Sequence, residues 1–470
     1  CVAFKEHEGE WMKTADRLKD FYKGKYNKYF SKYTRFTHNT VFSLVNLLLP
    51  NFIFQQPFII ARPRQPVMFK KLVDGNYQQM DNTTAATIRT AVINYDYKRI
   101  NAIAEDRKAV QDALFYGFGI TKTGYSYETV SEKDHDYIVK DSPFHKRIDP
   151  KDFGWHPLAT GLDDSTHLVH RILQPRSYLL DNPNIRKSDI EEIEAELPDY
   201  YKNKLSNEQK NFLKNYVTIC EVHDQENDML YLFAGEKKNL IMKMENPYDF
   251  NGSHFSMIKF AGDNDDFLGL PFMGMIEDEA VAINEIITMI VEHFRKFPGQ
   301  VFFEHGTIDE DDLERIRTGE QGSIHGVNDI SKLQFKAPLQ MGQEYFNILA
   351  LLQNQIDRTL GIPDFQRLTS TTRKSATEAS FVQGDATVRR AYFLSLVKDF
   401  VLDGVKKVAT LEQQFYDEEK EIVASGELHH QTIKFSKRDL EGEYQFDFDI
   451  DNMKYVNEAQ VNNLNNTLNI

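Results

Sequence analysis

The sequence is poor in cysteine and tryptophan, with two of each among 470 residues. Cys1 and Cys220 form no CxxC pair and no zinc pattern, which argues against a disulfide framework and a cysteine metal site. This usage fits a reducing compartment such as a bacterial cytoplasm. Polar residues and prolines interrupt the longest apolar stretch, 41–60, so it falls short of the roughly 20 residues that a membrane span needs.

An excess of positive charge is also missing. Lysine and arginine total 56 against 71 aspartates and glutamates, and the net charge is −15. A broad basic face that grips nucleic acid is therefore not expected, although DNA could still pass through a channel without tight binding. The motifs GxxxxGKS/T, GxGxxG, GxSxG and HExxH are all absent from the sequence. We expect a protein that is not an enzyme and that uses neither a metal nor a cofactor.

Aromatic residues, by contrast, are abundant. The sequence has 34 phenylalanines and 22 tyrosines, and 41% of its residues are hydrophobic. This composition favours a folded chain, and the length favours two or more subdomains. Because the sequence starts at Cys1 and stops at Ile470 inside a helical pattern, we expect it to be a fragment of a longer chain.

Hydrophobic periodicity predicts an α+β fold. A helical region is expected over 10–48, and Pro50 would end it. Two helices are expected over 81–116, ended by Gly117 and Gly119, and a further helical region over 186–216. Strands are expected at 121–130, 137–139, 153–156, 168–172, 217–222, 229–233, 255–260, 432–435 and 444–450.

Two helices flank a compact insert. The first, 273–296, has a heptad-like stripe that suits packing against a neighbouring helix, and its members are Ile276, Ala280, Ile283, Ile287, Ile290 and Phe294. The second, 340–360, has a stripe of Met341, Tyr345, Ile348 and Leu352. The insert, 300–338, reads as a strand at 301–303, a short acidic helix at 309–317 and a strand at 333–335.

A very long helix is expected over 376–415. Gly384 and Gly404 are its weak points, since a mid-helix glycine costs about 1 kcal/mol relative to alanine. The connector before it, 363–375, is polar and basic. This connector fits either an ordinary solvated loop or a loop that touches DNA phosphates.

Acidic and histidine clusters have structural readings that we favour over chemical ones. Asp263, Asp265 and Asp266 suit a turn better than a calcium loop, and His429-His430 suits a polar loop. The alternating Asp447, Asp449 and Asp451 suit the wet side of an amphipathic strand, with a two-metal nuclease as the alternative.

The order of these parts resembles the portal proteins of tailed double-stranded DNA bacteriophages over nearly the whole chain. Four segments carry the resemblance: AVQDALFYGFGITKTGY (109–125), RIDPKDFGWHPLATGLDDSTHLVHR (147–171), LGLPFMGMIEDEAVAINEIITMIVEHFRK (268–296) and TSTTRKSATEAS (369–380). They are similar to the wing helix leading into its sheet, a DP turn before strands, the start of the first stem helix, and the tunnel loop.

The resemblance implies a domain division. The expected parts are a wing (1–272), stem helix 1 (273–296), a clip (297–339), stem helix 2 (340–360), a tunnel loop (361–375), a long wing-crossing helix with a return to wing strands (376–454), and the start of a truncated crown (455–470).

The resemblance also implies a function. The chain would form a twelve-subunit ring at one capsid vertex of the virion, assembled in the host bacterial cytoplasm, and would provide the channel for genome packaging and ejection. Its partners would be the major capsid protein, the terminase large subunit, head–tail adaptor or tail proteins, and double-stranded DNA, with no membrane. Another virion structural or adaptor protein is the main alternative, and a metal-dependent nuclease is the second.

Three sets of site residues follow from this mapping. The tunnel-loop set, expected to touch DNA, is Arg367, Thr371, Arg373 and Lys374. The stem set, expected to line the channel and repel phosphate, is Glu277, Glu285 and Glu292. The clip set, expected as a docking surface, is Glu310, Asp311 and Asp312.

Overall fold

The computed structural model has helices and antiparallel strands in two compact units. Unit 1 comprises 1–19, 41–275 and 371–470, and unit 2 comprises 20–40 and 276–370. The structure describes residues 10–29, 36–53, 57–64, 69–73, 76–80, 82–132, 135–180, 182, 185, 193, 205–235, 239–250, 252–262, 265–296, 300–304, 308–311, 314, 330–336, 342–361, 376–417, 419–423 and 432–448. The mixed helix and strand content agrees with the expected α+β class.

The single helical region expected over 10–48 is wrong. Helix α2 spans Glu10–Tyr22 and a short 3-10 turn follows at Tyr26–Lys28, before α3 spans Thr40–Phe52. Gly24 ends the first segment with a φ of 74°, a conformation that favours glycine. Pro50 lies inside α3, because a proline near the end removes one hydrogen bond without unwinding the last turn.

The two helices expected over 81–116 are confirmed as α4 (Asn82–Arg99) and α5 (Ala102–Tyr116). Gly117 caps α5 with a φ of 84°. A Cβ atom added at Gly117 would lie 1.9 Å from the carbonyl oxygen of Gly269. This close approach requires glycine, and it lets the chain turn from α5 into the next strand. Gly119 already belongs to that strand.

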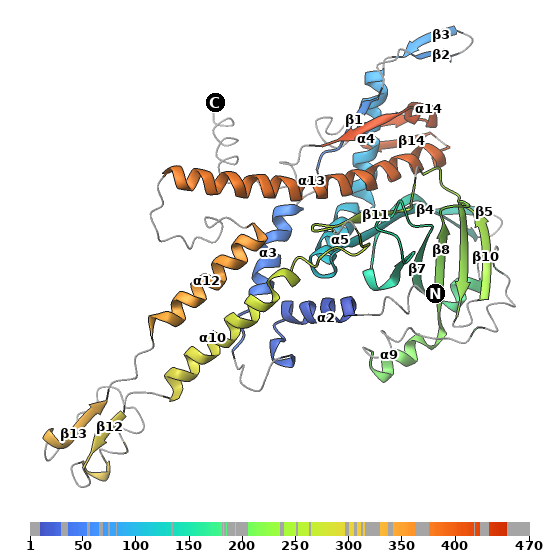
Figure 1. Ribbon diagram of the computed structural model, residues 1–470. Helices are drawn as coiled ribbons and strands as arrows, with labels where there is room; N and C mark the ends of the chain where they lie inside the picture. Colours follow the sequence, from blue (N-terminus) through green and yellow to red (C-terminus); the bar gives the residue numbers. More distant parts are fainter. Residues whose placement is uncertain are drawn as a thin grey trace. The chain divides into compact units, whose positions relative to one another are not determined.

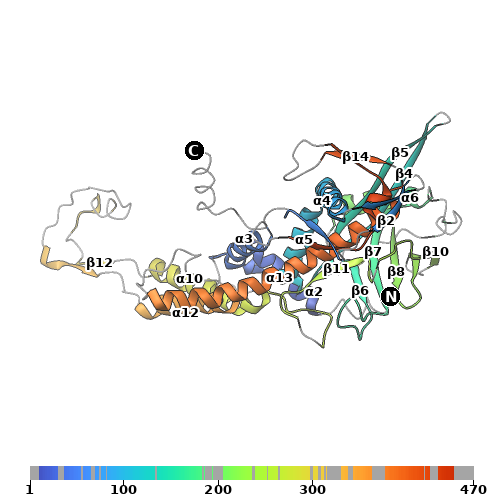
Figure 2. The ribbon, with the colours of Figure 1, turned by 90° about the horizontal axis from the view of Figure 1, so that it is seen from above.

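A three-stranded sheet follows, with the order β11-β4-β5. Strands β4 (Gly119–Glu132) and β5 (His135–Ile148) form a long hairpin, and β11 is Phe255–Ile258. In the view of Figure 2, the hairpin extends beyond the strands of the five-stranded sheet. The expected strands at 121–130 and 137–139 were right in kind but too short.

A five-stranded antiparallel sheet has the order β10-β9-β8-β7-β6. Its strands are β6 (Phe153–Trp155), β7 (His167–Pro175), β8 (Tyr216–Asp224), β9 (Met229–Ala234) and β10 (Asn239–Glu245). Four of these were expected, and β10 was not. Short helices α6 (Arg176–Leu180) and α9 (Asn207–Phe212) lie between β7 and β8, and much of the helix expected over 186–216 lies outside the described residues.

The long helix is confirmed as α13, Ala376–Phe415, which continues without a break through Gly384 and Gly404. It contacts α4, β4, β5 and β11 (Figure 1). Four two-stranded sheets complete the strands of the described residues. They pair β1 (Ile60–Pro63) with β16 (Tyr444–Asp447), β2 (Phe69–Val73) with β3 (Asn76–Met80), β12 (Gln300–Phe303) with β13 (Leu333–Lys336), and β14 (Lys420–Val423) with β15 (Thr432–Phe435).

Unit 2 contains a pair of helices. Helix α10 spans Glu277–Lys296 and α12 spans Gln343–Leu360, and the two lie side by side. Strands β12 and β13 lie beyond the C-terminal end of α10 and the N-terminal end of α12 (Figure 1). Within the described part of the chain, no helix combines the length and the apolarity that crossing a bilayer requires.

Candidate functional site

The helix pair of unit 2 is built on the stripe expected from the sequence, but only one end of α10 is covered. Ile276 just before α10 is buried, as are Ala280 and Ile283 within it, whereas Phe294 near the other end is 53% exposed. Segment 36–40 supports the covered end, since the amide of His38 donates to Asn284 Oδ1 at 2.6 Å. The guanidinium of Arg295 lies 5.1 Å from the centre of the Phe36 ring.

Exposed apolar side chains continue along both helices. Leu351 is 63% exposed, although it sits in the middle of α12. The exposed set, which we call the stem apolar set, is Met289, Phe294, Tyr345, Phe346, Ile348 and Leu351. Tyr345 and Ile348 were expected to pack in a helix stripe. Exposed apolar side chains on neighbouring helices are candidates for covering by another protein surface.

The three glutamates of the stem set, Glu277, Glu285 and Glu292, share one side of α10. Glu285 and Glu292 follow Glu277 by 8 and 15 residues, which rotates them by only about 60–80° around a helix of 3.6 residues per turn. Glu285 is exposed, and Glu277 and Glu292 are partly exposed. Glu279 of α10 accepts a hydrogen bond from Nε2 of Gln355 on α12 at 2.9 Å.

The clip and loop sets are only partly described. Glu310 and Asp311 are exposed, and Asp312 lies outside the described residues. All four tunnel-loop residues, Arg367, Thr371, Arg373 and Lys374, also lie outside the described residues. The structure does describe both flanks, because Gly361 caps α12 with a φ of 67° and α13 begins at Ala376.

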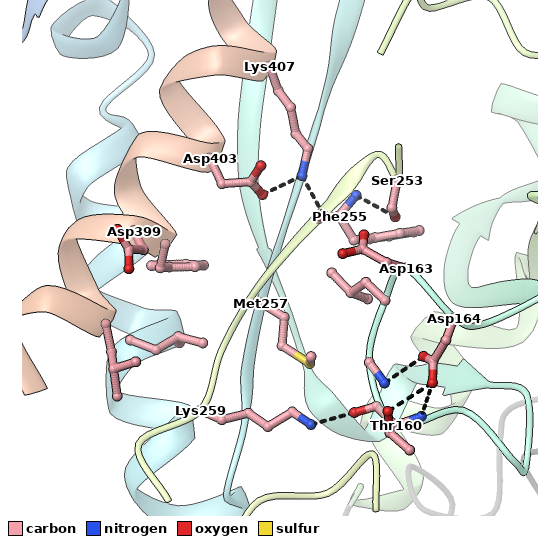
Figure 3. Close-up of a pocket in the computed structure, with 15 residues that line it drawn as sticks. Thr160, Asp163, Asp164, Ser253, Phe255, Met257, Lys259, Asp399, Asp403 and Lys407 are labelled. Carbon is pink, nitrogen blue, oxygen red and sulfur yellow. Dashed lines mark hydrogen bonds and ion pairs between the residues drawn. The ribbon is translucent and has the colours of Figure 1, made fainter. Parts of the chain in front are cut away.

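A cavity of about 610 Å³ lies in unit 1 between α13, β11 and the loop 160–164. Figure 3 shows Lys407 reaching from α13 toward Asp403 and the backbone of Phe255. Lys407 Nζ donates to Asp403 Oδ2 at 2.6 Å, to Phe255 O at 2.5 Å and to Ser256 Oγ at 2.9 Å. Burial lowers the pKa of Lys407.

The opposite wall of this cavity is a hydrogen-bonded turn. Asp164 accepts from the amide and hydroxyl of Thr160 at 2.8 Å each and from the amide of Gly161 at 2.7 Å. These hydrogen bonds, the Thr160 amide first, lower the pKa of Asp164. Lys259 Nζ donates to Thr160 O at 2.8 Å. Lys407, Asp164 and Lys259 thus hold backbone segments in place, which is a structural role.

Buried polar clusters were missed by sequence reasoning. In one, His145 contacts Thr123 Oγ1 through Nδ1 at 2.8 Å and Asp106 Oδ1 through Nε2 at 2.7 Å, and Tyr97 donates to the same carboxylate. The arrangement resembles a catalytic triad in composition. All of these side chains are fully buried under α13, however, so a substrate could not reach them.

A second cluster joins the two larger sheets of unit 1. Lys122 of β4 forms an ion pair with Glu221 of β8, and His223 Nε2 lies 2.6 Å from Glu221 Oε1. His170 lies nearby against the Phe255 ring, and His254 lies against the His223 ring. Its members are far apart in the sequence, so no spacing pattern could reveal it.

The remaining sequence clusters are only partly described. Among the described residues, no three histidine, cysteine, aspartate or glutamate side chains gather as a metal would require. Asp447 pairs with Lys398 at 2.6 Å, while Asp449 and Asp451 lie outside the described residues. Asp263 and His429-His430 also lie outside them. The nuclease alternative therefore gains no support from Asp447.

Comparison of the sequence with models of known protein families and with curated proteins finds no match.

Proposed function

We propose that this chain is a portal protein of a tailed double-stranded DNA bacteriophage. The carrying observation is the order of elements: α10, the β12–β13 pair, α12, a basic connector, and then the forty-residue α13. In this proposal unit 1 supplies the wing, α10 and α12 are the stem, and the segment between them is the clip.

The stem apolar set supports an assembled state. These side chains are exposed in the single chain, and water contact with them is unfavourable by about 25 cal/mol for each Å². Covering them with neighbouring copies around a closed ring would remove that cost and leave no unpaired surface. We infer a twelve-subunit ring at one capsid vertex of the virion.

The charges support a channel that does not hold DNA tightly. Glu277, Glu285 and Glu292 lie on one side of α10, where they would repel phosphate if that side faces the channel. Arg367, Thr371, Arg373 and Lys374 of the connector would be the groups that touch passing DNA. Glu310, Asp311 and Asp312 would dock the terminase large subunit during packaging and adaptor or tail proteins afterwards. The ring would also contact the major capsid protein.

Negative-stain microscopy with light scattering tests the proposal. The purified chain is expected to form rings with a central hole, and Phe346→Glu with Leu351→Glu should shift the mass toward monomer, because each buries a charge in the subunit contact. The matched control is Asn354→Glu, an exposed polar position on the same helix, which should leave rings intact. Stable monomers of the unmodified chain in every buffer would overturn the proposal.

A further inference from the structure

The contact between the two larger sheets of unit 1 contains five titratable side chains in a small volume, which we call the histidine junction: Lys122, His170, Glu221, His223 and His254. Lys122 lies on β4 of the three-stranded sheet, whereas Glu221 lies on β8 of the five-stranded sheet. Their ion pair therefore links one sheet to the other.

Phe255 of β11 lies at the centre of this contact. The ring centres of His223 and His170 are 4.9 and 6.3 Å from that of Phe255, and Lys122 Nζ lies 5.9 Å from it. The His254 ring meets the His223 ring edge-on at 4.3 Å. A new charge on any of the imidazoles would thus lie in an environment already shared with the Lys122 ammonium.

Hydrogen bonding fixes which tautomer two of the rings adopt when they are neutral. The Glu221 carboxylate can only accept, so His223 Nε2 carries the proton of the 2.6 Å contact. Asn246 Nδ2 donates to Asp228, which leaves Asn246 Oδ1 to accept from His254 Nε2 at 2.7 Å. Each ring then has one proton, and a second would have to go to Nδ1.

Charges face these rings from several elements. Positive groups are Lys122 from β4 and Lys407 from α13, and the negative group in contact is Glu221. A cavity of about 540 Å³ gives water a route to His223 and His254, and its lining also includes Asp163, Asp224 and Asp228. The three carboxylates of the cavity favour a protonated ring, while burial and the two lysines oppose one.

The balance lies on the neutral side. Burial, then His223 and Lys122, lowers the pKa of His254 to about 2. Burial, then Lys122, lowers the pKa of His170 to about 3, and burial lowers the pKa of His223 despite Glu221. Burial alone would raise the pKa of Glu221, but Lys122 and His223 outweigh it, and the pKa is well below the usual range.

We propose that the histidine junction is a proton-sensitive contact, at which mild acid releases the five-stranded sheet from β4 and β11. The inference concerns unit 1 alone and holds whether or not the chain forms a ring. A histidine held neutral when folded stabilises the contact fully above its unfolded pKa of about 6.5. That contribution is lost as the pH falls below 6.5 toward the folded pKa.

The size of the effect follows from linkage. Between pH 7.5 and 5.0, each histidine that protonates only in the opened state raises the opening constant about 30-fold. The variant His223→Gln with His254→Gln removes two such groups, and its glutamine amides can still donate to Glu221 and Asn246. The pH response of its opening constant should therefore be smaller by about 900-fold. The control His38→Gln changes an exposed histidine of unit 2 and should respond as the parent does.

Tryptophan fluorescence is a suitable readout. Trp155 of β6 stacks on Phe267 at 4.2 Å, and Trp11 lies 6.4 Å from Trp155, so both tryptophans of the chain report on one region of unit 1. Urea titrations followed by emission at pH 7.5 and 5.0 give the opening constants. The hydrogen-exchange protection of 216–234, taken relative to the intrinsic exchange rate at each pH, should decrease at pH 5.0, while the far-ultraviolet circular dichroism of the helices is retained.

Three results would overturn the proposal. One is a double variant whose pH response equals that of the parent. Another is loss of the helical signal together with the emission change, which would mean global unfolding. The third is unchanged exchange protection of 216–234 in the parent at pH 5.0. This result decides the matter if the double variant does not fold at pH 7.5.

Discussion

Gly404 lies inside a helix although glycine has a low helix propensity. It lies in the middle of α13, where alanine would be better by about 1 kcal/mol. A Cβ atom there would lie 2.9 Å from His145 Cε1. His145 cannot move aside freely, because Thr123 and Asp106 hold both of its ring nitrogens. The sequence marks Gly404 as a weak point of the helix, but the close approach of His145 favours glycine at this position.

We predict that Gly404→Ala destabilises unit 1 by up to about 2 kcal/mol, since overpacking costs about 1–3 kcal/mol and the gain in helix propensity offsets about 1 kcal/mol of it. Urea unfolding monitored by fluorescence measures the change. Gly262→Ala is the control, because a Cβ atom there meets nothing within 4 Å. A Gly404→Ala protein that is more stable than the parent would show that α13 does not depend on this contact.

At the scale of elements, a buried ion pair fastens α13 to α4. Arg89 Nη1 lies 3.1 Å from Glu412 Oε2, and both side chains are almost completely buried. Burial lowers the pKa of Arg89 and raises the pKa of Glu412. Both directions show that removing these charges from water is costly, so the pair depends on each member compensating the other.

Arg89→Met alone is predicted to cost about 3–5 kcal/mol, because it leaves an uncompensated buried carboxylate. Replacing both residues with methionine should recover most of that loss. The control is Arg64→Met, which breaks a pair with Glu443 whose side chains are 71% and 75% exposed, and it should cost less than about 1 kcal/mol. Denaturation midpoints of the three variants measure these differences. Equal losses for Arg89→Met and the double variant would contradict this reading.

Element prediction succeeded where a pattern was long. The stripe of α10 and the apolar residues of α13 extend over several turns, so their positions were predictable. It failed for β10 and β14, in which lysine and glutamate interrupt the apolar residues. It also shortened β5, where Pro143 and charged residues interrupt the alternation.

The candidate site was less predictable than the fold. An amphipathic pattern shows that one face of α12 is apolar, but it does not say whether the same chain covers that face. Tyr345 and Ile348 are exposed for this reason. The pairs Asp106–His145 and Lys122–Glu221 join residues 39 and 99 positions apart, and only the folded backbone brings them together.

At the scale of the whole molecule, the connector before α13 carries the sharpest prediction of the proposed function. Replacing Arg367, Arg373 and Lys374 with glutamine removes its positive charge, and we expect reduced DNA packaging or genome retention with rings still formed. Packaged DNA per particle and ring images measure the two properties separately. The charge-conserving exchange Arg367→Lys, Arg373→Lys and Lys374→Arg is the control. Unchanged packaging in the glutamine variant would contradict a DNA-touching role.

The stem apolar set has a further consequence for the newly made chain. In the proposed ring, a subunit released from the ribosome would present Phe294, Phe346 and Leu351 to the crowded cell before any copy covers them. Transiently bare apolar surface promotes aggregation and recruits chaperones. If the chain assembles as proposed, the yield of usable protein would depend on how quickly subunits meet one another, and production at low concentration would favour chaperone capture over correct assembly.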